Sequence, residues 1–248
     1  GRVRMSGTMV GKTFVKFVME RGETLVLLAI FQADVWAAYS IVQNLGSLVV
    51  RLLLFPIEDM SQLLFSKLCS ANNKQSAGEA LSVLLRIVML IGVVCASFGP
   101  AYSFTLIHLL YGTKWSDSAM PGLLSWYSWY IPLLALNGVT EAFLHASATP
   151  SQIATRSFLL MPTTMAYLSV SYVLAPHFGV SSLIIGNMAH LGVRILLSLR
   201  HIANFLPATF RLSSSLPSTA TLVVIVGSGL VGYAHDIAKI RGGWRAFQ

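Results

Sequence analysis

Four long stretches of this chain contain no aspartate, glutamate, lysine or arginine, and they limit its possible folds more than any other feature. They are residues 87–113, 118–140, 157–193 and 212–235. A helix that crosses the hydrocarbon core of a bilayer needs about 20 mostly apolar residues. The third stretch is long enough for two crossings, with a break at 176–179. Only 10% of the residues are charged, against about 25% in ordinary soluble domains. We therefore predict an all-α, polytopic membrane protein.

The sequence predicts seven membrane helices joined by short polar loops, with no room for a large soluble domain. Pro56 is expected to bend the second helix, because proline removes a backbone hydrogen bond. The glycine–proline pair at 99–100 is expected to break the third, with 102–111 continuing it at a new angle. The predicted helices cover residues 13–31, 36–66, 80–97, 121–146, 152–174, 181–199 and 219–234.

Basic residues are distributed unevenly between the two ends of the predicted bundle. Most loop lysines and arginines fall on the side of the N-terminus, so the positive-inside rule makes that side cytosolic. We interpret the net charge of +8 as basic cytosolic loops and not as a nucleic-acid site. The basic tail, with Lys239, Arg241 and Arg245, falls on the other side. Either one helix is miscounted or the natural chain continues, and we favour a longer natural chain.

Ionisable residues interrupt the apolar run of the second predicted helix. Asn44, Arg51 and Glu58 lie seven residues apart and share one helix face, which also includes Ser47. An unpaired charge at bilayer depth costs about 3 kcal/mol on insertion scales, so such residues usually face a cavity or a partner. We interpret this face as the wall of a polar path through the membrane. The alternative is that Arg51 forms a structural ion pair with Glu58 or Glu141.

The fourth predicted helix also has one polar face. Asn137, Glu141 and His145 follow one another at intervals of four residues. Glu141 has no cation beside it in this long apolar segment, which makes a purely structural role difficult to assign. Asn137 has a simple alternative role as a hydrogen bond between helices.

The sixth predicted helix carries Asn187, His190 and Arg194 on one face. Three polar faces on three helices can surround a hydrophilic cavity. In it, Arg51 and Arg194 would attract an anionic headgroup, and Glu58 or Glu141 would compensate them or take up a cation or proton.

Two alternatives concern this same face. Arg194 can instead extend to lipid phosphates at the interface. A proton relay from Glu141 through His145 or His190 is a further possibility.

Motifs of soluble enzymes are missing from the sequence. It has no GxxxxGK[ST] loop, no GxSxG and no HExxH. Its two cysteines, Cys69 and Cys95, fit no metal or disulfide spacing. We therefore predict a protein that is not an enzyme and that uses neither a cofactor nor a metal.

Four segments of the sequence resemble the Rft family of eukaryotic endoplasmic-reticulum membrane proteins. They are VMERGETLVLL (18–28), AAYSIVQNLGSLVVRLLLFPIED (37–59), LLALNGVTEAFLHA (133–146) and VRILLSLRHI (193–202). The resemblance covers residues 14–200. The family's motif positions fall on Gly22, Glu23, Asn44, Leu45, Gly46, Ser47, Arg51, Pro56, Glu58, Asn137, Gly138 and Glu141. Arg21 stands where the family usually has glutamate, which puts the charge pairing of the first helix in doubt.

The resemblance implies a role in moving dolichol-diphosphate oligosaccharide (Man5GlcNAc2) across the endoplasmic-reticulum membrane for N-glycosylation. The family is grouped with the multidrug/oligosaccharidyl-lipid/polysaccharide exporters, whose fold has two pseudo-symmetric lobes of six helices. By this resemblance, residues 1–206 are the second lobe, and residues 207–248 are an accessory helix and a truncated tail. The implied partners are the lipid bilayer, the dolichol-linked oligosaccharide and a missing N-terminal lobe of the same protein.

Two other functions fit the same pattern. One is an ion-coupled exporter of small molecules from the same superfamily, in which Glu141 would be the coupling residue. The other is a scaffold that holds the lipid or organises enzymes of the dolichol pathway without transporting anything.

Overall fold

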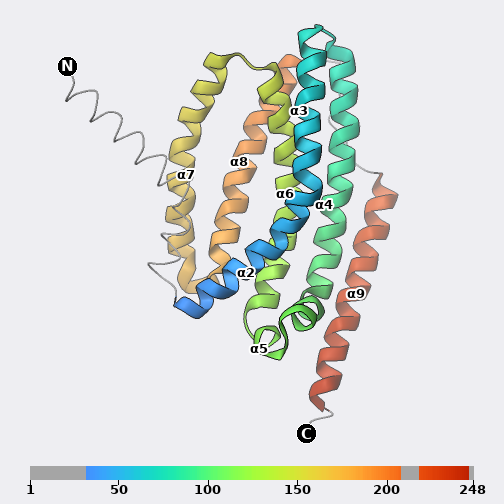
Figure 1. Cartoon of the computed structure of the whole chain (residues 1–248), viewed down its shortest axis with the longest axis vertical. Helices are drawn as coiled ribbons and strands as arrows, with labels where there is room; N and C mark the ends of the chain where they lie inside the picture. Colours follow the sequence, from blue (N-terminus) through green and yellow to red (C-terminus); the bar gives the residue numbers. More distant parts are fainter. Residues whose placement is uncertain (1–31, 208–217, 246–248) are drawn as a thin grey trace, which may run out of the picture.

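The computed structural model describes residues 32–207 and 218–245, and all regular structure in these two ranges is helical (Figure 1). The elements are α2 (Ala33–Val49), the π-helical turn η1 (Val50–Leu54), α3 (Phe55–Ser70), α4 (Lys74–Tyr111), α5 (Thr113–Ser116), α6 (Met120–Ser147), α7 (Pro150–Phe178), α8 (Ser181–Phe205) and α9 (Thr219–Arg245). The predicted helix at 13–31 lies outside the described residues.

In the described part of the chain, four helical segments are long and apolar enough to cross a membrane, which confirms the all-α, polytopic fold. They are Ala33–Ser70, Lys74–Tyr111, Pro150–Phe178 and Ser181–Phe205. The apolar part of α9, Thr219–Gly232, is shorter. The central helix α6 is not among the four, although its 28 residues are enough to span a bilayer.

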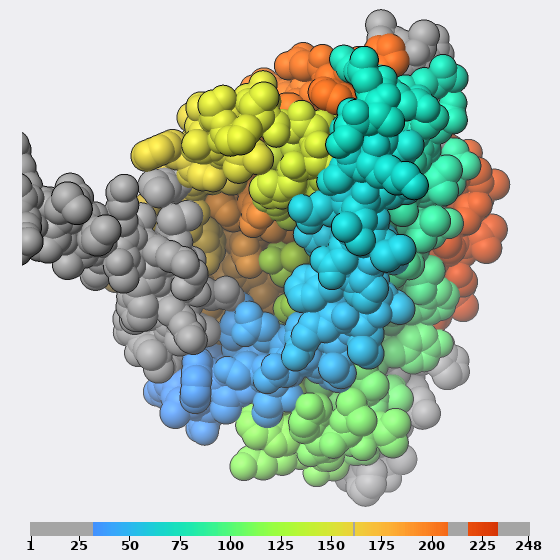
Figure 2. Space-filling model, turned by 45° about the horizontal axis from the view of Figure 1, so that its top comes forward, coloured from blue at the N-terminus to red at the C-terminus, as the bar shows by residue number. Residues whose placement is uncertain are grey.

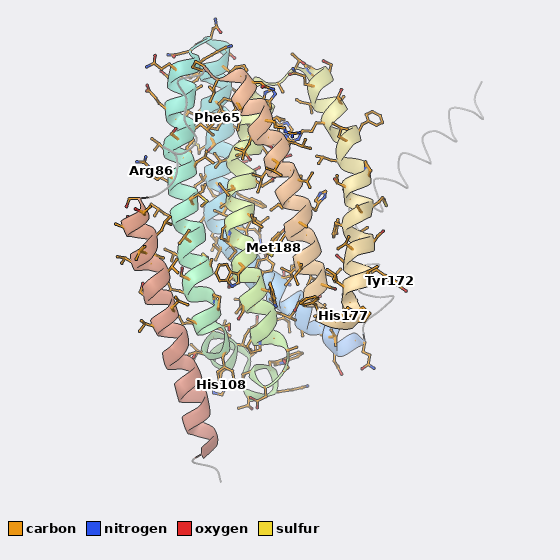
Figure 3. All side chains as sticks on the ribbon, turned by 180° about the vertical axis from the view of Figure 1, so that it is seen from behind. Phe65, Arg86, His108, Tyr172, His177 and Met188 are labelled. Carbon is orange, nitrogen blue, oxygen red and sulfur yellow. The ribbon has the colours of Figure 1, made fainter. Side chains whose placement is uncertain are left out.

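Helix α6 is the centre of the bundle. It contacts α2, α3, α4 and α8, whereas α7 packs mainly against α8 and α9 packs against α4. Seen from behind, α8 lies between α6 and α7 (Figure 3). An aromatic chain links three of these helices: Phe65 of α3 meets Phe143 of α6 edge-on at 5.0 Å, and Phe143 meets Phe205 of α8 at 5.8 Å. Any polar group held between α3, α6 and α8 is therefore surrounded by packed side chains.

The predicted bend near Pro56 is present and takes the form of a π-helical turn. The backbone N–H of Phe55 bonds to the carbonyl of Val50, five residues back instead of four. Pro56, one residue later, has no backbone N–H and so cannot form the usual helical hydrogen bond to the residue four positions back. A single π-helical turn often accommodates such a missing bond. Helix α2 is inclined to α3 across this turn (Figure 1). Arg51 lies within the turn.

The predicted break at Gly99–Pro100 is wrong. Helix α4 continues through both residues, from Lys74 to Tyr111, with Pro100 inside it. Gly99 has a packing role instead, because a Cβ there would lie 2.1 Å from the Ser128 hydroxyl of α6. In a membrane, small residues let helices approach closely, and neighbouring helices support a proline-interrupted backbone.

The predicted break at 176–179 is confirmed. Helix α7 ends at Phe178, and α8 begins at Ser181. Gly179 has a φ of +57°, a left-handed conformation that glycine adopts easily. At its other end, α7 begins with a capping box in which Thr149 and Gln152 bond to each other's backbone N–H. The helix therefore starts two residues earlier than predicted.

Replacing Gly46 with alanine is expected to loosen the packing of α2 on α6. A Cβ at this position would lie 2.2 Å from Cδ1 and 2.4 Å from Cε1 of the buried Tyr127 ring. Overpacking of this kind costs about 1–3 kcal/mol, so the unfolding temperature of the purified protein should fall. Gly122→Ala is the matched control, since nothing lies within 4 Å of its Cβ position and alanine favours a helix by about 1 kcal/mol. Equal unfolding temperatures for the two variants would contradict this packing.

Candidate functional site

An ion pair joins the two central helices of the bundle. Nη2 of Arg194 on α8 donates to Oε2 of Glu141 on α6 over 2.5 Å, and the Asn137 amide donates to the same oxygen over 2.9 Å. The Glu141 side chain is 16% exposed and the Arg194 side chain is 30% exposed. The pair therefore lies inside the protein but within reach of water. The Arg194 guanidinium is directed at Glu141, so α8 supplies the cation that Glu141 lacks in its own segment.

Glu58 of α3 lies directly beside this pair. Its Oε2 atom is 2.8 Å from the position that a Cβ on Gly138 would occupy, so the half-buried carboxylate lies against the α6 backbone where there is no side chain. Glu58 also interacts electrostatically with Glu141 and Arg194. Two carboxylates and a guanidinium group thus meet where α3, α6 and α8 pack together.

Arg156 of α7 is a second cation in this region. Its Nη2 atom donates to the backbone carbonyl of Arg194 over 3.0 Å and to the Ser198 hydroxyl over 2.7 Å. It also interacts electrostatically with Glu141 and Arg194. We call Glu58, Glu141, Arg156 and Arg194 the charged cluster; its formal charges, two negative and two positive, cancel.

Histidines lie at the edge of the charged cluster. Nε2 of His145 is 3.8 Å from Oε1 of Glu141, a contact that becomes an ion pair when His145 is protonated. His190 packs against the Tyr167 ring, with 5.4 Å between ring centroids, and interacts electrostatically with Arg194 and Glu141. Asn187 points elsewhere, because its amide donates to the Tyr130 hydroxyl over 2.9 Å and so ties α8 to α6.

Asn44, Ser47 and Arg51 form a separate polar stripe on α2 and η1. The Arg51 guanidinium donates to the Ser47 hydroxyl over 2.5 Å and to the Asn44 carbonyl over 3.4 Å. Asn44 and Arg51 are exposed. Within residues 32–207 and 218–245, no hydrogen bond or ion pair joins this stripe to the charged cluster. The alternative in which Arg51 pairs with Glu58 or Glu141 is therefore not the observed arrangement.

The surface is hollowed between the elements that carry these residues. Figure 2 shows a hollow with α2 and α3 on one side and the end of α6 with the start of α7 on another. Atoms of α6 and α8 form its floor in this view. The partial exposure of Glu141 and Arg194 is consistent with access to water from this side. In the described part of the chain, no group of three or more histidine, cysteine, aspartate or glutamate side chains could hold a metal ion.

The sequence reasoning missed Arg156 as a functional candidate. Arg156 directly precedes the uncharged stretch that begins at residue 157, so the sequence alone places it among the loop charges. The signal that could have revealed it is the Thr149–Gln152 capping-box pattern, which places the helix start at Pro150 and Arg156 in its second turn. The role of Gly138 could not be seen in the sequence, because its neighbour Glu58 is 80 residues away.

Known proteins resemble this chain over most of its length. The family model described as "Rft protein" matches residues 2–243. The chain is 31% identical to the Man(5)GlcNAc(2)-PP-dolichol translocation protein RFT1 of Xenopus tropicalis, over 94% of this chain and 46% of that protein. The proteins of the same name from Mus musculus and Candida glabrata are each 30% identical, over 95% and 89% of this chain and 46% and 43% of theirs.

The chain thus spans less than half the length of these relatives. No solved structure matches it significantly. The family model covers nearly all of the residues that form the bundle, the polar stripe and the charged cluster. The chain belongs to the Rft protein family.

Proposed function

We propose that this chain is one lobe of a glycolipid transporter that moves dolichol-diphosphate oligosaccharide across the endoplasmic-reticulum membrane for N-glycosylation. Residues 1–206 form the second lobe and 207–248 the accessory helix and tail, and a first lobe of the same protein completes the path. The protein acts without enzymatic chemistry and without a cofactor or metal. The proposal takes its substrate from the printed name of the relatives and its physical basis from the polar residues described above.

One observation supports transport by this lobe most directly: charged side chains are held in the middle of an otherwise apolar bundle and remain partly open to water. A diphosphate and its sugars must cross about 30 Å of hydrocarbon. A hydrated groove lined by polar and cationic groups lowers that barrier, while the polyprenyl chain stays in lipid. Such residues are costly in a bilayer and usually mark a transport path.

The two groups of polar residues have different roles in this proposal. The charged cluster is internally compensated, so it holds α3, α6, α7 and α8 in one arrangement. Among the described residues, Arg51 bonds to neutral groups of its own helix and to no carboxylate, so we take its positive charge to be available to an anion. We assign Arg51 as the cation that attracts the diphosphate. Rocking of two lobes about such a site is the usual mechanism of repeat-built transporters.

The His145–Glu141 contact favours a second candidate, a proton-coupled exporter of the same superfamily. In that case Glu141 would accept a proton during each cycle, and His145 would exchange it with water. This candidate requires that transport depend on a pH gradient, and Glu141→Gln should then abolish that dependence.

The test is leaflet transfer of a fluorescent dolichol-diphosphate oligosaccharide in vesicles that contain the full-length protein. We expect transfer to be faster than in protein-free vesicles, and to be unaffected when the pH is the same on both sides. A membrane protein of equal mass from another family controls for leakage. Tight binding of the lipid without any acceleration of transfer would support the scaffold function instead. Transfer that requires a pH gradient would support the proton-coupled exporter.

A further inference from the structure

One side of α2 carries a row of open side chains that extends beyond the polar stripe. Trp36, Gln43 and Asn44 are exposed, and Ser40 is half-buried. They stand at i, i+7, i+8 and i+4, which places them within about 100° of one another around the helix. At about 1.5 Å per residue, Trp36 lies about 20 Å from Arg51 along the helix. We call Trp36, Ser40, Gln43 and Asn44 the outer face of α2.

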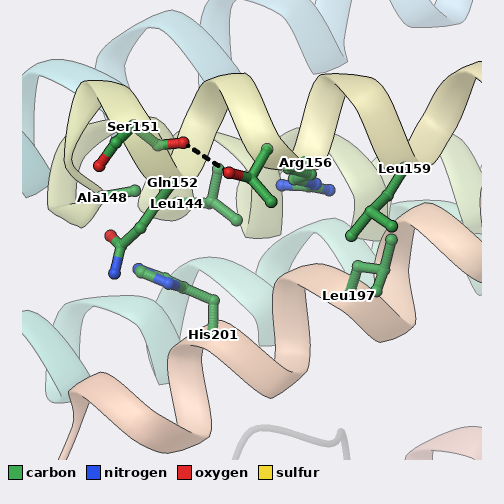
Figure 4. Close-up of a pocket in the computed structure, with 9 residues that line it drawn as sticks. Leu144, Ala148, Ser151, Gln152, Arg156, Leu159, Leu197 and His201 are labelled. Atoms are coloured by element: carbon green, nitrogen blue, oxygen red, sulfur yellow. Dashed lines mark hydrogen bonds between the residues drawn. The ribbon is translucent and has the colours of Figure 1, made fainter.

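The carboxamide side chains of the outer face are open, whereas two others in the bundle are bonded within the protein. The Asn187 amide donates to a tyrosine hydroxyl of α6. Gln152, in the wall of a cavity between α6, α7 and α8 (Figure 4), accepts the backbone N–H of Thr149. In the ranges that the structure describes, the hydrogen bonds to Asn44 use its backbone carbonyl, and the Gln43 side chain is exposed. An open carboxamide is costly against hydrocarbon, so this face favours a polar occupant.

The chemistry of the outer face matches a carbohydrate better than an ion. No charged residue lies between Asp34 and Arg51, so the face is neutral along its length. Carboxamide and hydroxyl groups both donate and accept hydrogen bonds, as sugar hydroxyls do. The Trp36 side chain is 40% exposed, and its flat apolar ring with an N–H at the edge can lie against the C–H face of a sugar ring. At the other end of the face, the Arg51 fork fits a diphosphate.

An apolar edge accompanies these polar groups on the same segment. Leu48, Leu52 and Phe55 are all exposed. Figure 2 shows α2 on one side of the hollow, so the segment borders both the water-accessible interior and the surroundings of the bundle. Polar and apolar surfaces side by side are what an amphiphile with a sugar head and an isoprenoid chain requires.

We propose that the outer face of α2 binds the sugars of a diphosphate-linked glycolipid. Trp36 stacks on one sugar ring, and the polar side chains between Trp36 and Arg51 bond to sugar hydroxyls. The choice of this lipid rests on the proposed function, which assigns the diphosphate to Arg51. The lobe thus reads the glycan as well as the phosphate, and the same lipid without sugars is a poorer ligand.

Binding of two probes to the full-length protein in phosphatidylcholine nanodiscs tests this assignment. One probe is a polyprenyl diphosphate that carries the Man5GlcNAc2 glycan, and the other is the same lipid without sugars. The parent should bind the glycosylated probe at least about tenfold more tightly, as expected for two or more neutral hydrogen bonds.

Trp36→Ala should weaken binding of the glycosylated probe by about fivefold and change binding of the sugar-free probe by less than about twofold. Trp36→Phe keeps an aromatic ring, so its affinity should lie between those of the parent and Trp36→Ala. Trp126→Ala is the matched control, because Trp126 is 39% exposed but belongs to α6. Its affinity for both probes should equal that of the parent.

A double variant, Gln43→Ala with Asn44→Ala, removes both open carboxamides. It should weaken binding of the glycosylated probe by about tenfold and leave the sugar-free probe unaffected. Both side chains are exposed, so the unfolding temperature should change little, which separates lost binding from lost folding. Asn204→Ala removes an exposed carboxamide from the last turn of α8 and should have no effect on either probe.

Equal affinity of the parent for the two probes would overturn the assignment. Losses of the same size for both probes would also overturn it, and so would an equal loss in Trp126→Ala. The transfer assay reports separately. Accelerated transfer of both lipids with equal affinities would refute only sugar binding by the outer face, whereas variant-sensitive binding of the glycosylated probe without any transfer would refute only the proposed function.

Discussion

Replacing Glu141 with glutamine is expected to destabilise the protein and to abolish complementation of a strain that lacks it. The change removes the charge that compensates Arg194 and leaves a guanidinium group in the centre of the bundle. Truncating one partner of a buried charge pair costs about 2–5 kcal/mol. Because the Arg194 side chain is 30% exposed, water can partly replace the lost partner. We therefore expect about 2 kcal/mol, measured as a fall of several degrees in the unfolding temperature.

A double-mutant cycle tests whether the two charges act as a pair. Arg194→Gln alone should also be destabilising, because it leaves Glu141 beside Glu58 with less compensation. The double variant removes both charges. Its loss in free energy of unfolding should be smaller than the sum of the losses of the two single variants by at least about 0.5 kcal/mol. Additive effects would show that the pair is not coupled. Glu79→Gln, on the exposed first turns of α4, is the control and should change stability by less than about 0.5 kcal/mol.

Most of the helical framework could be predicted from the sequence, because the bilayer requires long uncharged segments and these are visible as such. The predicted helix at 121–146 agrees with the observed Met120–Ser147 to within one residue at both ends. The prediction failed at Gly99–Pro100, where a local rule about helix breakers competed with packing against Ser128. The sequence shows that residue 99 is a glycine, but it does not show that Ser128 packs against it.

The candidate site could be predicted only in part, because residue spacing shows which side chains share a helix face but not which faces meet. The face with Asn137 and Glu141 was recognised, but its cation, Arg194, lies 53 residues further along the chain. Asn44, Arg51 and Glu58 share a face at heptad spacing, yet the structure divides them between the polar stripe and the charged cluster. The π-helical turn, which contains Arg51 and precedes Glu58, changes the helical register on which that spacing depends.

Replacing Arg51 with alanine should produce the opposite combination of effects, a folded protein that no longer transports. Arg51 is exposed, and within residues 32–207 and 218–245 its hydrogen bonds reach only Ser47 and Asn44 of its own helix. Its removal should change the unfolding temperature little, since exposed positions without tertiary contacts usually contribute less than about 0.5 kcal/mol. If Arg51 attracts the diphosphate, loss of one charge-assisted contact should slow leaflet transfer by about tenfold or more.

Arg51→Lys and Arg86→Ala make this prediction specific. Lysine keeps the positive charge but loses the planar fork, so its transfer rate should lie between those of the parent and Arg51→Ala. Arg86 is exposed on α4, and its replacement by alanine removes an equal charge from a helix that does not carry the polar stripe. Full complementation by Arg51→Ala, or an equal loss in Arg86→Ala, would mean that the transported lipid does not pass along α2. Under the proposed function, Glu141 and Arg51 represent two kinds of residue, those that hold the helices together and those that meet the transported lipid. Only a change at the first kind should alter stability and activity together.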